Sequence, residues 1–219
     1  VIRNNNVSGA VNTGVQLRET NSTLVIDGNS FNGATQGLRL VAAAGPWTLP
    51  NTNTFVGTGV TTFDDVIELF QTSNITLSGL DLSAAGTGTA VHLISTTNST
   101  VTNNNLSGSA YGLYTTGVTN TGLVVTGNNV SSSSEYGMYL DSVNNSLVLT
   151  GNTFTSSAVG LRLQNLVGPF TLSGTNTFAD VGAGTGDPVI WLQATRDVTL
   201  SGLNLSDNSG LGIGVHLVG

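Results

Sequence analysis

The sequence predicts an all-β solenoid of about nine coils, in which each coil stacks on the next. The main observation is that an apolar residue recurs behind an Asn-rich turn at steps of 24 or 27 residues along the whole chain. A repeat this short cannot bury its own apolar face, so neighbouring repeats must share one continuous core. The recurring positions are Val7, Phe31, Phe55, Leu82, Leu106, Val130, Phe154, Phe178 and Leu205.

A second, longer period is superimposed on this spacing. The segment 21–31 returns in similar form as 144–154, and the same offset of 123 residues carries Gly45-Pro-Trp onto Gly168-Pro-Phe. The two 27-residue steps also stand five coils apart. A copied irregularity indicates that a block of five coils has been duplicated in tandem.

We therefore expect one domain, a single solenoid over residues 1–219, with a first block in 1–123 and a partial second block in 124–219. The sequence opens at Val1 inside a coil and stops at Gly219 just after an inward-facing pair. Open ends of a β-solenoid present unpaired strand edges. We expect the chain to be part of a longer array, with its ends meeting flanking coils of the same chain or identical subunits.

Each coil is expected to contain a strand, an Asn-rich turn and a second strand. Successive side chains of a strand point to opposite faces, so alternating apolar residues form inward columns. We call the recurring apolar positions the anchors. One inward column stands five residues before most anchors, but at Leu49 and Leu172 the separation is six residues. The extra residue predicts one-residue bulges near Pro50 and Ser173. The second strand supplies inward pairs such as Leu38 and Leu40 in each coil.

A buried column of asparagines is expected two residues before the anchors. An inward amide costs stability unless it is hydrogen-bonded, and stacking at the coil spacing lets each amide bond the next. Asn also tolerates the left-handed backbone of a tight turn. The expected structural ladder is Asn5, Asn29, Asn53, Asn104, Asn128, Asn152 and Asn176, with Leu80 and Leu203 in the two remaining coils.

The pattern apolar-x-x-Gly-Asn-x-apolar, followed by Gly-apolar-x-apolar, occurs at 148–154 and 160–163. It resembles the right-handed parallel β-helix repeats of the pectate-lyase-like superfamily, and the resemblance covers essentially the whole chain. Similar coils occur in polysaccharide lyases and hydrolases, uronate epimerases, phage tailspikes, adhesin stalks and surface filaments. The resemblance therefore implies the fold and its handedness more than a function.

The composition limits the partners. Twelve acidic residues against five basic ones give a net charge of −7, which disfavours nucleic acid or an anionic membrane as a partner. No apolar run approaches the roughly 20 residues of a membrane helix, so we expect no membrane insertion. Charged residues are 8% of the chain, so Ser, Thr, Asn and Gly must solvate it, as is common in secreted bacterial surface proteins. We expect an extracellular or cell-surface location.

The outward residue between the inward pairs forms the chemically richest column. Arg39, Glu68 and His92 on three successive coils could clamp or deprotonate a uronate, and these are the catalytic candidates if the chain is an enzyme. Aromatic residues of the same column could stack on sugar rings. We favour the simpler interpretation that the column is an exposed cross-strand ladder. The candidate carbohydrate-binding residues are Tyr114, Tyr139 and Trp191.

A metal site has weak support. The lyases of the resembled superfamily bind Ca²⁺ through clustered carboxylates, and Asp64, Asp65 and Glu68 are the matching group here. The copy of that group in the second block retains one carboxylate, Asp187, so we favour loop capping and expect no cofactor. Zinc has less support still, because His92 and His216 lie five coils apart and the chain has no Cys.

Two classes of function remain. Duplication copies irregularities as a block, whereas an active site is a unique constellation, so we favour a structural segment of a β-helical stalk, adhesin or filament. The alternative is a carbohydrate-active enzyme or binder that uses an outer strand face, with polysaccharide as its partner. Ice binding has little support, because the Thr-x-Thr pairs do not recur from coil to coil.

Overall fold

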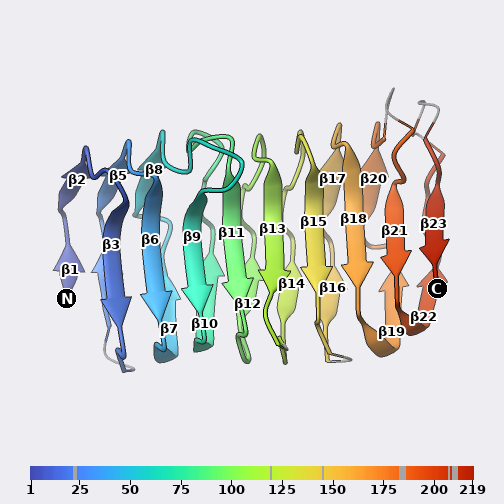
Figure 1. Cartoon of the computed structure of the whole chain (residues 1–219), viewed down its shortest axis with the longest axis horizontal. Helices are drawn as coiled ribbons and strands as arrows, with labels where there is room; N and C mark the ends of the chain where they lie inside the picture. The colour runs from blue at the N-terminus through green and yellow to red at the C-terminus, as the bar shows by residue number, and fades with distance from the viewer. Residues whose placement is uncertain (22–23, 119, 145, 183–185, 207, 209–211) are drawn as a thin grey trace.

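The computed structural model describes residues 1–219 with the exception of 22–23, 119, 145, 183–185, 207 and 209–211. In the described part every regular element is a β-strand, and all paired strands are parallel. Figure 1 shows the coils side by side along one axis, with the two termini at opposite ends. No helix that could cross a membrane occurs among these residues. The expected all-β solenoid of about nine coils is confirmed.

The longest sheet has nine strands and runs along the whole molecule, at the front of Figure 1. Consecutive strands of this sheet belong to consecutive coils, so each strand pairs with the equivalent strand before and after it. In spatial order the strands are β3 (Thr13–Arg18), β6 (Gln36–Val41), β9 (Asp65–Phe70), β11 (Thr89–Ile94), β13 (Tyr111–Thr116), β15 (Tyr136–Asp141), β18 (Val159–Gln164), β21 (Ile190–Gln193) and β23 (Val215–Val218).

Two interrupted faces complete each coil. The first carries β1 (Ile2–Arg3) with β4 (Ile26–Asp27), then β7 (Ala44–Leu49), β10 (Ser73–Ser78), β12 (Thr100–Thr102), β14 (Val124–Thr126) and β16 (Val148–Thr150), then β19 (Val167–Ser173) with β22 (Arg196–Ser201). The second carries β2 (Asn6–Ser8), β5 (Ser30–Asn32) and β8 (Thr54–Val56), and later β17 (Thr153–Thr155) with β20 (Thr177–Ala179). Isolated parallel bridges continue this second face between the two groups.

The register places like residues on like residues. Val7 pairs with Phe31 and Phe31 with Phe55, so the anchors predicted from the 24-residue step are direct neighbours across coils. The rings of Phe31 and Phe55 stack with centroids 4.7 Å apart, and those of Phe154 and Phe178 with centroids 4.6 Å apart. The repeat therefore aligns the side chains that build the core.

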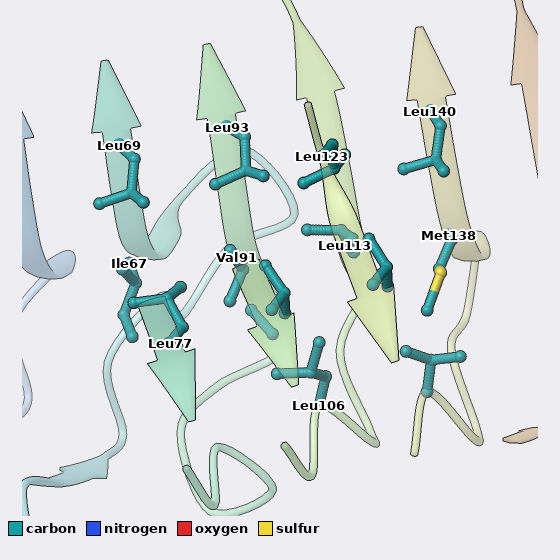
Figure 2. Close-up of a cluster of buried hydrophobic side chains, with 14 of the residues drawn as sticks. Ile67, Leu69, Leu77, Val91, Leu93, Leu106, Leu113, Leu123, Met138 and Leu140 are labelled. Atoms are coloured by element: carbon teal, nitrogen blue, oxygen red, sulfur yellow. The ribbon is translucent and has the colours of Figure 1, made fainter. Parts of the chain in front are cut away.

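The core is one continuous cluster of aliphatic and aromatic side chains from all three faces. Figure 2 shows its middle part, where Leu69, Leu93 and Leu140 follow one another along the nine-stranded sheet and Leu77 and Leu106 approach from the other faces. These side chains are at most 1% exposed. Burial of this apolar surface, at about 25 cal/mol per Å², is the main stabilising term.

The predicted slip at Leu49 has a different form from a strand bulge. Leu49 lies directly opposite Leu77, and the extra residue is accommodated in the next turn, where the Asn53 amide donates to the Pro50 carbonyl. Ser173 begins the same kind of turn, with the Asn176 amide as donor. A register shift does occur within β7, but it lies before Trp47, between Ala44 and Trp47.

The inward asparagines are joined by side-chain hydrogen bonds. In five successive pairs the Nδ2 of one Asn donates to the Oδ1 of the Asn one coil further on, each time at 3.0 Å. The series is interrupted at Leu80, whose backbone amide donates to Asn104 Oδ1 at 2.9 Å. Asn5 lies at the exposed first coil, and the six other members are buried. The bonded pairs are Asn5–Asn29, Asn29–Asn53, Asn104–Asn128, Asn128–Asn152 and Asn152–Asn176.

Candidate functional site

The outward column of the nine-stranded sheet is aligned rung by rung. In order its residues are Gln16, Arg39, Glu68, His92, Tyr114, Tyr139, Arg162, Trp191 and His216. The structure therefore brings the three catalytic candidates together as neighbours, and it separates Tyr139 from Trp191 by the rung that carries Arg162.

Glu68 is occupied by its neighbours. Its Oε1 accepts a hydrogen bond from Arg39 Nε at 2.9 Å, and its Oε2 accepts one from Gln36 Nε2 at 2.7 Å. Although it belongs to an outward column, Glu68 is 7% exposed, and its carboxylate is enclosed by its hydrogen bonds to Arg39 and Gln36. Both oxygens of the carboxylate are therefore used within the protein.

His92 belongs to a different set of contacts. Its Nδ1 lies 3.0 Å from Asp65 Oδ2, and its Nε2 lies 2.8 Å from Thr116 Oγ1. Both ring nitrogens are therefore occupied by protein groups. His92 therefore does not converge with Arg39 and Glu68 on a common point, although the three occupy successive rungs.

The aromatic face is wider than the outward column suggests. Tyr111 and Tyr136 begin β13 and β15 and lie beside Tyr114 and Tyr139, with ring centroids 5.0–5.6 Å apart within this group of stacked and tilted contacts. The sequence did not indicate Tyr111 and Tyr136, because alternation along a strand places residues three apart on opposite faces. Both strands depart from alternation here, since the two residues between the tyrosines are both buried.

Arg162 forms a rung of this stack. Its guanidinium carbon lies 4.5 Å from the Tyr139 ring centroid and 4.4 Å from that of Trp191, and its Nη2 donates to Gln193 Oε1 at 2.6 Å. Such cation–π contacts contribute about 0.5–2 kcal/mol each. Tyr139 and Trp191 therefore face Arg162, which covers the ring surface that a sugar would need.

Burial changes the acidity of the tyrosines. It raises the pKa of Tyr111, Tyr114 and Tyr139 above the ordinary value of 10.0, because the phenolate would lose solvation in the stack. For Tyr111 the nearby Glu135 carboxylate adds to the shift. The Arg162 guanidinium opposes the shift in all three tyrosines, and burial remains its largest cause.

A pocket of about 380 Å³ lies at the same end of the stack. Two of its walls come from the nine-stranded sheet, and a third comes from the loop between β8 and β9, which contains most of the extra residues of the first long coil. It is lined by Thr62, Phe63, Asp65, Thr89, His92, Tyr111, Tyr114 and Glu135.

The acidic group of the first long coil is divided among separate partners. Asp64 Oδ2 accepts a hydrogen bond from the Thr61 backbone amide at 2.9 Å, which is a loop-capping contact. Asp65 contacts His92, and Glu68 contacts Arg39. Among the described residues, no three His, Cys, Asp or Glu side chains are grouped so that they could hold a metal ion.

Comparison with known proteins supplies the family. The model of the family described as "Periplasmic copper-binding protein (NosD)" matches residues 47–187, which is more than half of the chain. The chain belongs to the NosD family. Among curated proteins, none matches this NosD-family chain by sequence.

A solved structure gives the same fold. The surface protein and adhesin PfbA of Streptococcus pneumoniae superposes with a TM-score of 0.58 at 12% identity, covering 93% of this NosD-family chain and 68% of PfbA. The similarity shows a common β-helical fold. The NosD family is described as periplasmic and PfbA as a surface protein, and both descriptions agree with the extracellular or cell-surface location expected from the composition.

The residues of this chain do not fit a copper site. Copper in proteins is held by imidazole nitrogens and by the sulfur of Cys or Met. The chain has two His, one Met and no Cys. Met138 is fully buried in the core, both ring nitrogens of His92 contact protein groups, and His216 lies five rungs further along the sheet, stacked on Trp191. These donors cannot meet at one ion.

Proposed function

We propose that this NosD-family chain is a structural segment of an extracellular β-helical stalk, adhesin or filament. The observation that carries the proposal is the continuity of the stacking. Core side chains and outward rungs continue from coil to coil in register, and the hydrogen-bonded asparagines do so on either side of Leu80. An architecture in which every coil contacts its neighbours alone is suited to spanning distance.

The last coil presents a surface for further stacking. Leu217 lies directly opposite Leu192 in the register of the nine-stranded sheet, yet Leu192 is 3% exposed and Leu217 is 71% exposed. Exposed apolar side chains beside an unpaired strand edge favour addition of another strand. We propose that flanking coils or an identical subunit cover this edge.

The geometry of Arg39 and Glu68 argues against the alternative function, a carbohydrate-active enzyme. A uronate would need a free cation and a free base, but the Arg39 guanidinium and the Glu68 carboxylate are bonded to each other. Opposite charges on adjacent rungs are the arrangement of a stabilising cross-strand pair.

Electron microscopy of the native, untruncated protein tests the structural role. Nine coils at a strand spacing of about 4.8 Å form a rod of roughly 43 Å. Continuous rods much longer than this are expected, and short, discrete, capped particles would contradict the proposal.

For residues 1–219, sedimentation should show self-association, and the variant Leu217→Asp should abolish it. Phe63→Asp, a matched control on an exposed apolar residue away from the edge, should leave it intact.

A further inference from the structure

The row of aromatic rings on the aromatic face stops at Tyr111, because the next strand carries a small residue, Thr89, at the paired position. Four successive strands of the nine-stranded sheet begin with residues that each pair with the next one along the sheet. These residues are Asp65, Thr89, Tyr111 and Tyr136. Tyr111 stacks on Tyr136 on one side, with centroids 5.6 Å apart. On the other side its neighbour is Thr89, whose short side chain cannot cover a phenol ring. The surface of Tyr111 that faces Thr89 therefore opens into the pocket described above.

The gap has the dimensions of a binding slot. Asp65 and Tyr111 are two strands apart, which corresponds to about 9.6 Å at the usual spacing. Thr89 forms the floor between them, and Phe63, which is 93% exposed, stands at the rim. The volume of about 380 Å³ falls within the roughly 300–1,000 Å³ of small-molecule sites. One compact group can enter between Asp65 and Tyr111 and take the place of the absent rung.

The charge of the slot is negative. Among the described residues that line it, Asp65 and Glu135 supply carboxylates and none supplies a guanidinium or an ammonium group. Both nitrogens of His92 are used by Asp65 and Thr116, so the imidazole offers no free donor to a ligand.

We propose that this slot binds a compact organic cation, a quaternary or protonated amine, which lies against the open face of Tyr111 between the Asp65 and Glu135 carboxylates. An aromatic face attracts a cation through its quadrupole, and nearby carboxylates balance the remaining charge. A uronate carries the wrong charge for this slot. A neutral sugar gains nothing from the two carboxylates beyond hydrogen bonds. The binding does not depend on the stalk role, because it uses residues of four adjacent coils.

Calorimetric titration of the full chain with choline tests the ligand class, and 3,3-dimethylbutan-1-ol serves as the neutral isostere of the same shape. Choline should bind at least about fivefold more tightly than the isostere, which follows from a cation–π contribution of about 1 kcal/mol. Equal affinities would overturn the proposal, as would the absence of choline binding at about 10 mM. Tighter binding of methyl glucoside or galacturonate than of choline would also overturn it, in favour of a saccharide site.

Two variants locate the site. Thr89→Tyr fills the gap with a ring and should abolish choline binding while the circular dichroism spectrum stays unchanged. Glu135 is exposed, so Glu135→Gln should fold normally and weaken choline binding several-fold without affecting the isostere. Glu19→Gln makes the same change of charge at an exposed position outside the slot and should have no effect. Unchanged choline binding in both Thr89→Tyr and Glu135→Gln would show that the cation binds elsewhere.

Discussion

Asn128 is the position where the buried asparagines can be tested most directly. Its Oδ1 accepts hydrogen bonds from the Asn104 backbone amide and from Asn104 Nδ2, both at 3.0 Å. Its Nδ2 donates to the Val101 carbonyl at 2.8 Å and to Asn152 Oδ1 at 3.0 Å. Asn128→Ala removes all of these bonds in a site that is 1% exposed.

The expected cost follows from the groups left behind. The Asn104 backbone amide loses its acceptor in a buried position, which costs about 1–3 kcal/mol. The Val101 carbonyl loses a donor, which adds about 1 kcal/mol. Asn104 Nδ2 keeps the Leu77 carbonyl at 3.1 Å, so it adds little. We expect Asn128→Ala to lower the free energy of unfolding by about 2–4 kcal/mol.

Urea denaturation followed by circular dichroism measures this loss, and amide hydrogen exchange at Asn104 shows whether it arises at the proposed bond. The matched control is Asn5→Ala at the exposed first coil, where water replaces the lost bonds and the cost should stay below about 1 kcal/mol. Equal costs for the two variants, or unchanged exchange at Asn104 in Asn128→Ala, would refute the reasoning.

Three further predictions concern the backbone, the ion pair and the phenols. A Cβ at Gly112 would lie 2.6 Å from the Gly137 carbonyl oxygen, whereas at Gly214, the same position of the last coil, the nearest atom is 3.9 Å away. Gly112→Ala should therefore cost about 1–3 kcal/mol in urea unfolding, and Gly214→Ala almost nothing. Glu68→Ala should cost about 1–2 kcal/mol and make Arg39 more mobile by NMR, because two donors lose their acceptor; an unchanged midpoint would contradict the pairing. A raised phenol pKa in the folded state means that stability is fully present below about pH 10 and falls as the pH rises above it. Absorbance at 295 nm should show later ionisation in the native than in the urea-unfolded protein, and coincident curves would exclude the shift for Tyr111, Tyr114 and Tyr139.

The fold was predictable because its information is periodic. The 24-residue step between Phe31 and Phe55 predicts that the two rings are neighbours, and they stack. Alternation places Leu38 and Leu40 inside, where both are fully buried. These positions are determined by the stacking of one coil on the next, which is the same in every coil, so the repeat in the sequence predicts them. The 123-residue block remains a prediction from the sequence.

The candidate site was less predictable because it depends on departures from the period. Glu68 occupies an outward rung, but it is buried beside Arg39 and Gln36, whose side chains hydrogen-bond to it, and the spacing does not reveal these contacts. The slot beside Tyr111 needs a small residue at Thr89 and a loop that reaches over the sheet edge. The loop belongs to the first of the two long coils, and the 24-residue step does not predict where its residues Thr62 and Phe63 lie.

The constant distance along the chain between paired strands also bears on how the protein folds. Because each residue meets its partner one coil away, as Val7 meets Phe31, additional coils lengthen the molecule without lengthening any loop that must close. Contact order, which slows the folding of most parallel sheets, therefore falls relative to chain length as coils are added. Once the first two coils have paired, each later coil can add to a template that is already formed. We expect such a chain to fold progressively from one end as it emerges into its compartment, at a pace set by single coils.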